Sequence, residues 1–248
     1  MLLCIKIGNS TINLAFFQNP DASDFTLSSF ETKEALKCKN KLKNLSLKNE
    51  MDCIVCSVVP EVAKEFSAIL ESLCKKIIFL NYKTYTGLTL KLYHPETFGV
   101  DRLACAVAAY ENFRDNLAVI DAGTATTITV VTKKGEIIGG SIMPGINTMN
   151  IALSEKTACL PVVDINKTVV ALGKDTHSAI LSGIVLGTVR GIEGILQEIE
   201  KETNLKLITV LTGGYSELLS QYMKRKYFIN KHLVIEGMRL VYLKNIKN

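Results

Sequence analysis

Apolar runs that end at glycine turns mark two similar stretches of the chain. The first run enters a turn at Gly8 and returns through residues 13–17, and the second enters a turn at Gly123 and returns through residues 128–132. Strand-like runs on both sides of a short glycine turn are typical of a β-hairpin. Each stretch is therefore predicted to be a β-hairpin, not the strand-to-helix turn of a P-loop.

The two hairpins are separated by about half of the chain. Lys6 and Asp121 occupy equivalent places, so the offset is 121 − 6 = 115 residues in a chain of 248. One such turn alone would be interpreted as an ordinary hairpin turn. Two turns at this offset indicate a duplicated unit. Glycine turns flanked by Ser, Thr and Asn let backbone N–H groups approach an anion. We expect two α/β domains, residues 1–115 and 116–248, whose turns face each other as a phosphate clamp.

Hydrophobic periodicity predicts the remaining elements. Strands are expected at residues 52–59, 77–81 and 208–211, and helices at 61–75, 102–113 and 175–203. A hairpin turn at Gly135 precedes residues 137–140, and Pro144-Gly145 opens a loop into a helix through Ala158. The strand at 208–211 runs into Thr212-Gly213-Gly214-Tyr215, a turn suited to contact with a flat ligand such as a nucleoside.

Four glycines recur on roughly one face of the long helix predicted at residues 175–203: Gly183, Gly187, Gly191 and Gly194. Glycine destabilises a helix unless something packs very close to it. Two interpretations remain open at this point. The face packs against another helix of the same domain, or it forms a homodimer interface.

Composition excludes several protein classes. The chain is 48% hydrophobic and 21% charged, which excludes disordered and fibrous proteins, and 29 basic minus 24 acidic residues give a net charge of +5. This excess suits anionic small ligands and is too small to indicate nucleic-acid binding. The lysine-rich residues 33–48 lack interleaved aromatic residues and are interpreted as a solvated, flexible surface segment. The apolar start closes at Lys6, so we expect no signal peptide, no membrane span and a cytoplasmic location.

Cysteine and histidine give no sign of a metal site. Seven scattered cysteines are expected to be reduced thiols. Cys53 and Cys56 have CxxC spacing, but they lie in an apolar strand and their side chains point to opposite faces. They are therefore interpreted as cysteines of the core. The three histidines have no partner at zinc-ligand spacing.

Asp101 and Arg102 follow Gly99 at the predicted start of the helix at 102–113. An aspartate there can simply cap the helix. The functional interpretation makes Asp101 a general base and Arg102 a donor to an anionic or polar substrate group, with Gly99 allowing close approach.

Four motifs taken together carry a resemblance to a known family: IKIGNST at residues 5–11, GVDR at 99–102, DAGTATT at 121–127 and GGSIMPGI at 139–146. The chain resembles the type III pantothenate kinases of the sugar kinase, Hsp70 and actin ATPase superfamily, from Met1 to Gly237. The resemblance implies two ribonuclease H-like domains related by duplication, with a nucleotide in the interdomain cleft. It also implies a homodimer that phosphorylates pantothenate with ATP, Mg²⁺ and a monovalent cation, K⁺ or NH₄⁺.

The resemblance also implies site residues. Asp101 matches the base that takes the proton from the pantothenate hydroxyl, and Asp121 matches the monovalent-cation ligand. The positions that match substrate contacts are Tyr93, Gly99, Val100, Arg102 and Thr176. The positions that match ATP contacts are Lys6, Ile7, Gly8, Asn9, Ser10, Thr11, Gly123 and Thr124.

Lys6 departs from the family pattern, which has an aspartate before the first glycine turn. The internal repeat gives the same expectation, because Lys6 aligns with Asp121. A charged lysine cannot bind Mg²⁺, although its ammonium could contact phosphates directly. Three interpretations follow: weakened catalysis with altered metal use, a non-catalytic nucleotide or substrate binder, or a change introduced into this sequence.

Two other functions compete with the pantothenate kinase. One is a nucleotide-binding regulator that keeps the fold, as relatives described as accessory transcription factors do, although no helix-turn-helix pattern supports direct DNA binding. The other is a kinase or phosphohydrolase of the same superfamily that acts on a different small alcohol. GVDR together with Tyr93 favours pantothenate through the resemblance.

Overall fold

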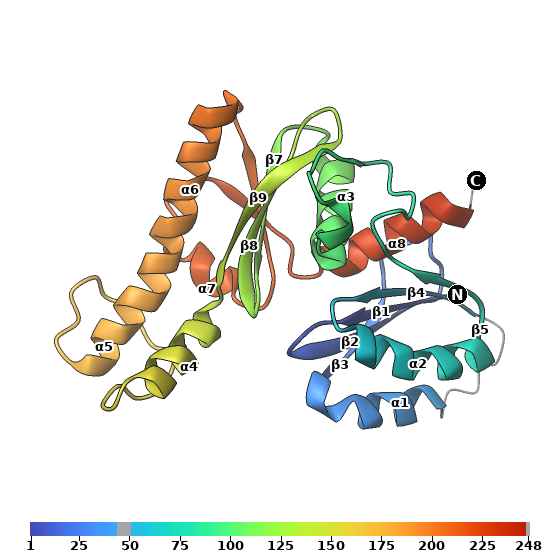
Figure 1. Cartoon of the computed structure of the whole chain (residues 1–248), viewed down its shortest axis with the longest axis horizontal. Coiled ribbons are helices and arrows are strands. Elements are labelled where there is room, and N and C mark those ends of the chain that lie inside the picture. The colour runs from blue at the N-terminus through green and yellow to red at the C-terminus, as the bar shows by residue number, and fades with distance from the viewer. Residues whose placement is uncertain (44–50, 247–248) are drawn as a thin grey trace. The chain divides into compact units, whose positions relative to one another are not determined.

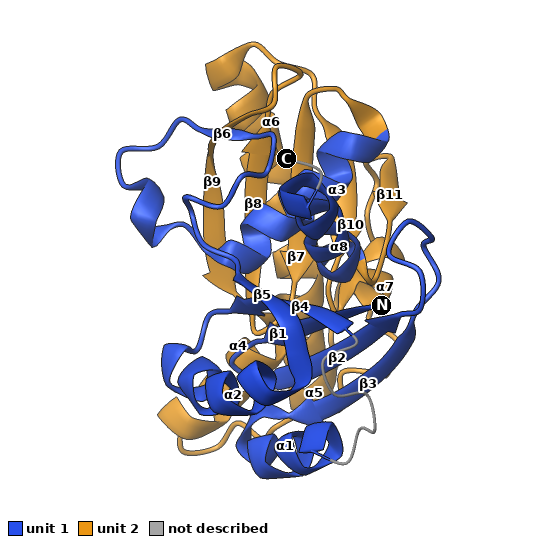
Figure 2. Ribbon diagram, turned by 90° about the vertical axis from the view of Figure 1, so that its right-hand side faces the viewer, with its two compact units in different colours: residues 1–112, 233–248 blue, residues 113–232 orange. Residues whose placement is uncertain are grey.

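A computed structural model describes residues 1–43 and 51–246. The chain divides into two compact units (Figure 2). Unit 1 comprises residues 1–112 and 233–248, and unit 2 comprises residues 113–232.

Unit 1 is built on a five-stranded sheet with the strand order β3-β2-β1-β4-β5. Its strands are β1 (Leu2–Ile7), β2 (Thr11–Phe17), β3 (Thr26–Glu31), β4 (Met51–Ser57) and β5 (Cys74–Phe79). The first three strands are antiparallel neighbours, whereas β4 runs parallel to β1 and β5 parallel to β4. The predicted hairpin at Gly8 is confirmed, with Lys6 opposite Asn13.

The helices of unit 1 include α1 (Ala35–Lys43), α2 (Pro60–Leu73), α3 (Val100–Phe113) and α8 (Leu233–Ile246), with the short elements η1 (Thr32–Glu34), β6 (Thr89–Leu90) and η2 (Pro95–Thr97). Pro60 occupies the first turn of α2, where its missing N–H costs nothing. Phe66, Leu70 and Leu73 form the buried stripe of α2. They join residues of β1, β2 and β4 and the buried Cys38 and Leu42 of α1 in one core. Figure 1 shows α1 and α2 on the same face of this sheet.

The lysine-rich segment is ordered as a helix over its described part, which the sequence did not predict. Lys37 pairs with Glu34 in the preceding turn, Lys39 pairs with Glu65 of α2, and Lys41 donates to Ser28 at 2.7 Å. The lysines therefore cover the outer surface of α1 while Leu42 anchors the helix to the core. Lys48 lies outside the described residues.

The last helix, α8, belongs to unit 1 although it follows unit 2 in sequence. It packs on β1 and β4, and the Tyr242 hydroxyl donates to Asp52 at 2.7 Å. Gly237 lies so close to α3 that a Cβ there would overlap the carbonyl group of Ala104. The predicted division at residues 115 and 116 lies close to the end of the first segment, but the unit boundaries differ from it because α8 returns to the first sheet.

Unit 2 repeats the sheet topology of unit 1, with its strands in the order β11-β10-β7-β8-β9. They are β7 (Leu117–Ala122), β8 (Ala125–Val131), β9 (Glu136–Pro144), β10 (Ile208–Thr212) and β11 (Tyr227–Ile229). As in unit 1, three strands are antiparallel neighbours (β9, β8 and β7), whereas β10 runs parallel to β7 and β11 parallel to β10. The hairpins at Gly123 and Gly135 are confirmed. The strand after Gly135 continues through Pro144, so no loop precedes the next helix.

The helices of unit 2 are α4 (Ile146–Lys156), α5 (Thr176–Leu181), the π-helical η3 (Ser182–Leu186), α6 (Gly187–Thr203) and α7 (Ser216–Ser220). The predicted helix start is confirmed, because Asp175 caps α5 in a reciprocal capping box with Ser178. The predicted long helix exists as α5, η3 and α6 in succession and packs along the sheet (Figure 1). A wider π-helical turn therefore interrupts the predicted regular helix.

The helical run at Thr176–Thr203 has 28 residues and, by length and composition alone, could cross a membrane. In its most apolar window 44% of the residues are buried in the structure, and Val185, Val189 and Ile192 belong to the core of unit 2. A core helix of a globular domain passes the same test, so this feature is weak support for a membrane span.

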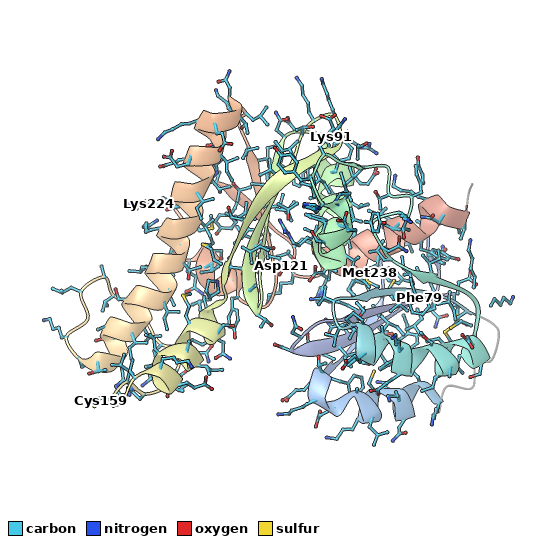
Figure 3. All side chains as sticks on the ribbon, viewed as in Figure 1. Phe79, Lys91, Asp121, Cys159, Lys224 and Met238 are labelled. Atoms are coloured by element: carbon cyan, nitrogen blue, oxygen red, sulfur yellow. The ribbon has the colours of Figure 1, made fainter. Side chains whose placement is uncertain are left out.

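The seven cysteines are free thiols, as predicted. Six are buried, and Cys159 is exposed after the end of α4 (Figure 3). Cys53 packs with α1 and α2, whereas Cys56 is buried outside that cluster, in agreement with opposite faces.

Candidate active site

The turn between β1 and β2 carries the first glycine motif. The Gly8 N–H donates to the Thr11 carbonyl at 2.9 Å, and Thr32 supports the turn by donating its N–H to Ser10 and its hydroxyl to Gly8. Asn9, Ser10 and Thr11 are exposed at its tip. Ile7, the last residue of β1, is buried.

Lys6 lies beside this turn, half-buried in β1 between Asn13 of β2 and Cys56 of β4. A Cβ on Gly8 would lie 3.9 Å from Lys6 Cε, so the aliphatic part of the lysine runs along the turn. The structure therefore places this cation at the motif where an aspartate was expected.

The turn between β7 and β8 carries the second motif, and it is one residue shorter. Its register pairs Ala122 with Thr126, whereas Ile7 pairs with Ile12. Asp121 has the same place in β7 as Lys6 has in β1 and lies between Thr127 and Thr212 in the sheet (Figure 3).

The Asp121 carboxylate lies against backbone on two sides. A Cβ on Gly213 would overlap its Oδ1 and would lie 2.6 Å from the Ala122 carbonyl oxygen, while a Cβ on Gly123 would lie 3.7 Å from the same Oδ1. Gly213 also has φ +91°, a conformation that favours glycine. Two glycines thus leave room for a carboxylate at the end of the central strands.

The start of α4 closes against the same turn. The Gly145 N–H donates to the Thr124 carbonyl at 3.0 Å, and the Thr148 hydroxyl donates to that oxygen at 2.6 Å. A Cβ on Gly145 would overlap the Gly123 carbonyl and lie 2.5 Å from the Thr124 oxygen. The third glycine of the GGSIMPGI motif, Gly145, is therefore required by the close approach of two backbone segments.

The turn after β10 adjoins a cavity within unit 2. The Tyr215 N–H donates to the Ala122 carbonyl at 3.0 Å, which ties this turn to the end of β7. A cavity of about 440 Å³ is lined by residues that include Asn166, Lys167, Gly214, Tyr215, Gln221 and Tyr222. Partial burial raises the pKa of Tyr215, so its phenol stays neutral beside the cavity. The mixed polar and aromatic lining could hold a flat polar ligand.

The GVDR motif forms the first turn of α3. Asp101 Oδ1 accepts from the Arg102 N–H at 2.8 Å, and a Cβ on Gly99 would lie 2.8 Å from the same oxygen. Asp101 lies inside the first turn and accepts one of the N–H groups that have no partner within the helix, so it also serves the structural role expected of an aspartate at a helix start. The Arg102 guanidinium stacks on Phe98 at 4.6 Å, and burial lowers its pKa, opposed by the charge of Asp101.

Two predicted substrate positions lie on exposed surface. Tyr93 is fully exposed and precedes the loop in which His94 Nδ1 lies 3.2 Å from Glu96 Oε1. Thr176 is the exposed first residue of α5. The structure brings together Gly99, Val100, Asp101 and Arg102 at the start of α3, whereas Tyr93 and Thr176 lie on other segments.

Three residues around the second turn were not predicted as site residues: Gly145, Thr148 and Gly213. Gly145 and Gly213 lie in motifs that the sequence flagged, but the close approaches that require them come from segments far apart in the chain. Nothing in the local sequence pattern signals Thr148.

The described residues contain no group of three or more His, Cys, Asp or Glu side chains able to hold a metal ion. Asp121, with carbonyl groups of the adjoining turns, offers the oxygen donors that a hard cation prefers. Magnesium keeps several waters and binds substrate phosphates, so it does not require a cage of protein ligands.

The glycines of the long helix do not pack closely within unit 2. A Cβ at Gly183, Gly187 or Gly194 would meet nothing within 4 Å, and one at Gly191 would make ordinary contact with Met143 at 3.7 Å. Close packing on a helix of the same domain is therefore wrong as an explanation for these glycines.

Comparison with known proteins gives consistent results. Residues 2–198 match the family model for type III pantothenate kinase. The type III pantothenate kinase of Dictyoglomus turgidum is 36% identical over 259 aligned positions, covering 99% of this chain and 100% of the relative. The corresponding protein of Persephonella marina is 32% identical, covering 98% of each chain.

Solved structures show the same fold at low identity. A Campylobacter jejuni protein assigned to the Baf family of transcriptional activators has a TM-score of 0.66 at 20% identity, covering 99% of this chain and 100% of that one. Spiroplasma citri MreB 5 bound to AMPPNP has a TM-score of 0.54 at 12% identity, covering 100% and 98%. These likenesses and the repeated sheet topology confirm the predicted actin-like ATPase fold class with two ribonuclease H-like units. With the family model spanning most of its length and two full-length relatives above 30% identity, this chain belongs to the type III pantothenate kinase family.

Proposed function

We propose that this protein transfers the γ-phosphoryl group of ATP to the hydroxyl group of pantothenate, the first step of coenzyme A biosynthesis, in the cytoplasm. The observation that carries the proposal is Asp101 in the first turn of α3, within the GVDR motif of a chain of this family. Its carboxylate is held by the Arg102 N–H and is sterically accessible because residue 99 is glycine.

In the reaction, Asp101 accepts the proton of the pantothenate hydroxyl as that oxygen forms a bond to the γ-phosphorus. The bond from the γ-phosphorus to the bridging oxygen breaks, and ADP leaves with the electron pair. Such transfer depends on positioning and on charge neutralisation more than on covalent help from the protein. Arg102 is suited to hold the pantothenate carboxylate, since burial and the Phe98 ring restrict its guanidinium.

We assign ATP binding to the two glycine turns. Residues 6–11 of unit 1 and Gly123 and Thr124 of unit 2 form turns at equivalent sheet positions, and Asn9, Ser10, Thr11 and Thr124 are exposed in them. The cavity beside Gly214 and Tyr215 is a candidate for the base or ribose. Asp121 would hold a monovalent cation, K⁺ or NH₄⁺, which would add positive charge near the phosphates.

The substrate contacts proposed for Gly99, Val100 and Arg102 follow from their place around Asp101. Tyr93 and Thr176 are proposed as further contacts through the resemblance alone, and their exposure leaves them available to a ligand.

The same protein is proposed to be a homodimer. Gly183 and Gly187 lie one helical turn apart on an exposed face with open space around them. An apolar groove beside them includes Met149, Leu153 and Ile180. Light scattering of the purified chain and of Gly187→Leu tests the dimer, because a leucine in the interface should shift the protein toward a monomer.

The kinase is tested by measuring ADP release with and without pantothenate, in K⁺ and in Na⁺ buffer. Pantothenate-dependent ADP that is lost in Asp101→Asn supports the kinase. Asp115 is an exposed aspartate that lies outside the helices, so Asp115→Asn serves as the matched control and should leave the rate unchanged. Pantothenate-independent ADP release, or an Asp101→Asn variant as active as the parent, would reject the proposal.

A nucleotide-binding regulator is the second candidate, favoured by Lys6 at the position of the expected aspartate. It predicts tight nucleotide binding with no turnover in every variant, Lys6→Asp included.

A further inference from the structure

The carbonyl group of Thr124 receives two hydrogen bonds from the start of α4. One comes from the Gly145 N–H at 3.0 Å and the other from the Thr148 hydroxyl at 2.6 Å. Both distances lie in the ordinary range for their donor types. The turn that carries Thr124 is thus attached to a helix through one backbone oxygen.

Holding this oxygen fixes more than the carbonyl group itself. The peptide unit is planar and trans, so the direction of the Thr124 carbonyl also sets the direction of the Ala125 N–H. Residue 145 cannot restrain this peptide with a side chain, because a Cβ on Gly145 would overlap the turn. The Thr148 hydroxyl supplies a side-chain restraint on this peptide.

We propose that Thr148 is a positioning residue for the ATP-binding turn: its hydroxyl holds the Thr124 peptide in the orientation that binds nucleotide. This inference rests on the proposed function, in which Thr124 contacts ATP. Thr148 itself does not need to touch the nucleotide or the reacting atoms.

Thr148 contributes little to the stability of the fold. Its side chain is exposed, so removing the hydroxyl and methyl groups leaves no core cavity. The helix is anchored independently by buried Asn150, which accepts from the Val163 N–H at 3.0 Å and donates to the Val163 carbonyl at 2.8 Å. Loss of the Thr148 bond should therefore alter the turn without unfolding α4.

The same helix offers a matched control. Thr157, exposed at the other end of α4, donates its hydroxyl to the Leu153 carbonyl at 2.7 Å. Thr157→Ala removes the same chemical group and the same kind of bond, together with a longer bond that the hydroxyl accepts from the Leu160 N–H at 3.3 Å, at a place remote in the helix from the turn. Thr148→Ser keeps the hydroxyl and serves as the rescue variant.

The experiment measures KM for ATP, KM for pantothenate and kcat for the full chain and the variants Thr148→Ala, Thr148→Ser and Thr157→Ala. We expect Thr148→Ala to raise KM for ATP about three- to tenfold, the effect of one hydrogen bond. KM for pantothenate and the melting temperature should stay within error of the parent values, and Thr148→Ser and Thr157→Ala should resemble the parent. Calorimetric titration with AMPPNP gives the nucleotide Kd in parallel.

Equal rises in both KM values, an equal effect of Thr157→Ala, or an unchanged KM and Kd in Thr148→Ala would overturn the inference. If the parent binds AMPPNP but transfers no phosphoryl group to pantothenate, the proposed kinase fails, while the AMPPNP Kd values still decide the role of Thr148. A parent that neither binds AMPPNP nor turns over ATP would reject both.

Discussion

Lys6 and Asp121 show how one side chain can change the chemistry of a repeated position. Both are the fifth residue of the central strand in their sheets, and both precede a glycine turn. The Lys6 side chain extends beside its turn and carries a positive charge, whereas the Asp121 carboxylate lies between two glycines. At this position the first unit therefore lacks the carboxylate that the second unit has, and we expect the difference to affect metal use and turnover.

Lys6→Asp is expected to raise kcat by about tenfold or more, equivalent to about 1.4 kcal/mol in the activation barrier. The new carboxylate would help to hold hydrated magnesium beside the phosphates. Initial rates at saturating Mg²⁺ measure the effect. Lys6→Met is the control that removes the charge without adding an acid, and it should not reproduce the gain. Equal rates for the parent and Lys6→Asp would contradict the prediction.

Gly213 and Gly214 provide a second comparison between neighbouring residues. Gly213→Ala would force a Cβ against Asp121 and Ala122 at φ +91°, so we expect a loss of about 1–3 kcal/mol in unfolding free energy and weaker nucleotide binding. Gly214→Ala meets nothing within 4 Å and should leave the unfolding free energy nearly unchanged. Urea unfolding distinguishes the two variants, and equal losses of unfolding free energy would show that the close approach at Gly213 is unimportant.

At the scale of elements, Arg225 connects α6 to the strands of unit 2. Its guanidinium donates to both carboxylate oxygens of Glu200, at 2.8 and 2.6 Å, and to the Leu207 carbonyl at 2.6 Å. Its Nε donates to Thr209 on β10 at 2.7 Å. The Arg225 hydrogen bond lowers the pKa of Glu200, partly offset by burial. The end of the long helix is thereby fixed to the sheet.

This ion pair predicts a pH dependence of stability. Because the pKa of Glu200 is lower in the folded state, its contribution is present above the ordinary value of 4.5 and is lost as pH falls through the folded value. Glu200→Gln should lower the melting temperature at pH 7 and flatten its decline below roughly pH 4.5. Glu198→Gln, whose carboxylate pairs with exposed Lys201, should leave the decline unchanged. The measurement is thermal unfolding at several pH values, and parallel curves for all three proteins would refute the assignment.

The elements that the sequence predicted are those whose own pattern decides their structure. The hairpins at Gly8 and Gly123 combine apolar strands with a glycine turn, and α2 carries its buried stripe at helical spacing. Strands β3 and β11 were missed because their residues are largely exposed and are ordered by pairing with β2 and β10. The lysine-rich α1 was missed because Cys38 and Leu42, not its many lysines, determine its helical packing.

The candidate site was predictable to a similar extent. Asp101 and the glycine turns were found from motifs, since each depends on residues adjacent in sequence. The turn that contains Gly213 was flagged by the sequence, but its close approach to Asp121 joins residues 92 positions apart and has no local signal. Thr148 bonds to Thr124 across 24 positions, and no local pattern predicts it.

At the scale of the whole molecule, the two units differ in how the chain builds them. Unit 2 is one continuous segment, residues 113–232, whereas unit 1 requires α8 from the other end of the chain. The buried face of α8 includes Leu233, Ile235, Met238 and Val241. Burial of each such side chain contributes about 1.5–3 kcal/mol, and a typical domain is stable by only about 5–15 kcal/mol. Unit 1 should therefore not survive the loss of this helix.

A chain that ends at His232 is expected to keep unit 2 folded and to lose unit 1. Hydrogen exchange followed by mass spectrometry should show protection retained in β7, β8 and β10 and lost in β1 and β4, on which α8 packs. Adding a synthetic peptide of residues 233–248 should restore protection to β1 and β4, because the peptide re-forms the missing face. The matched control is the same peptide with Gly237→Leu, which cannot approach Ala104 and should restore little. Full protection of β1 and β4 without the peptide would show that residues 1–112 fold independently, and the repeat would then be two autonomous domains with a redundant C-terminal helix.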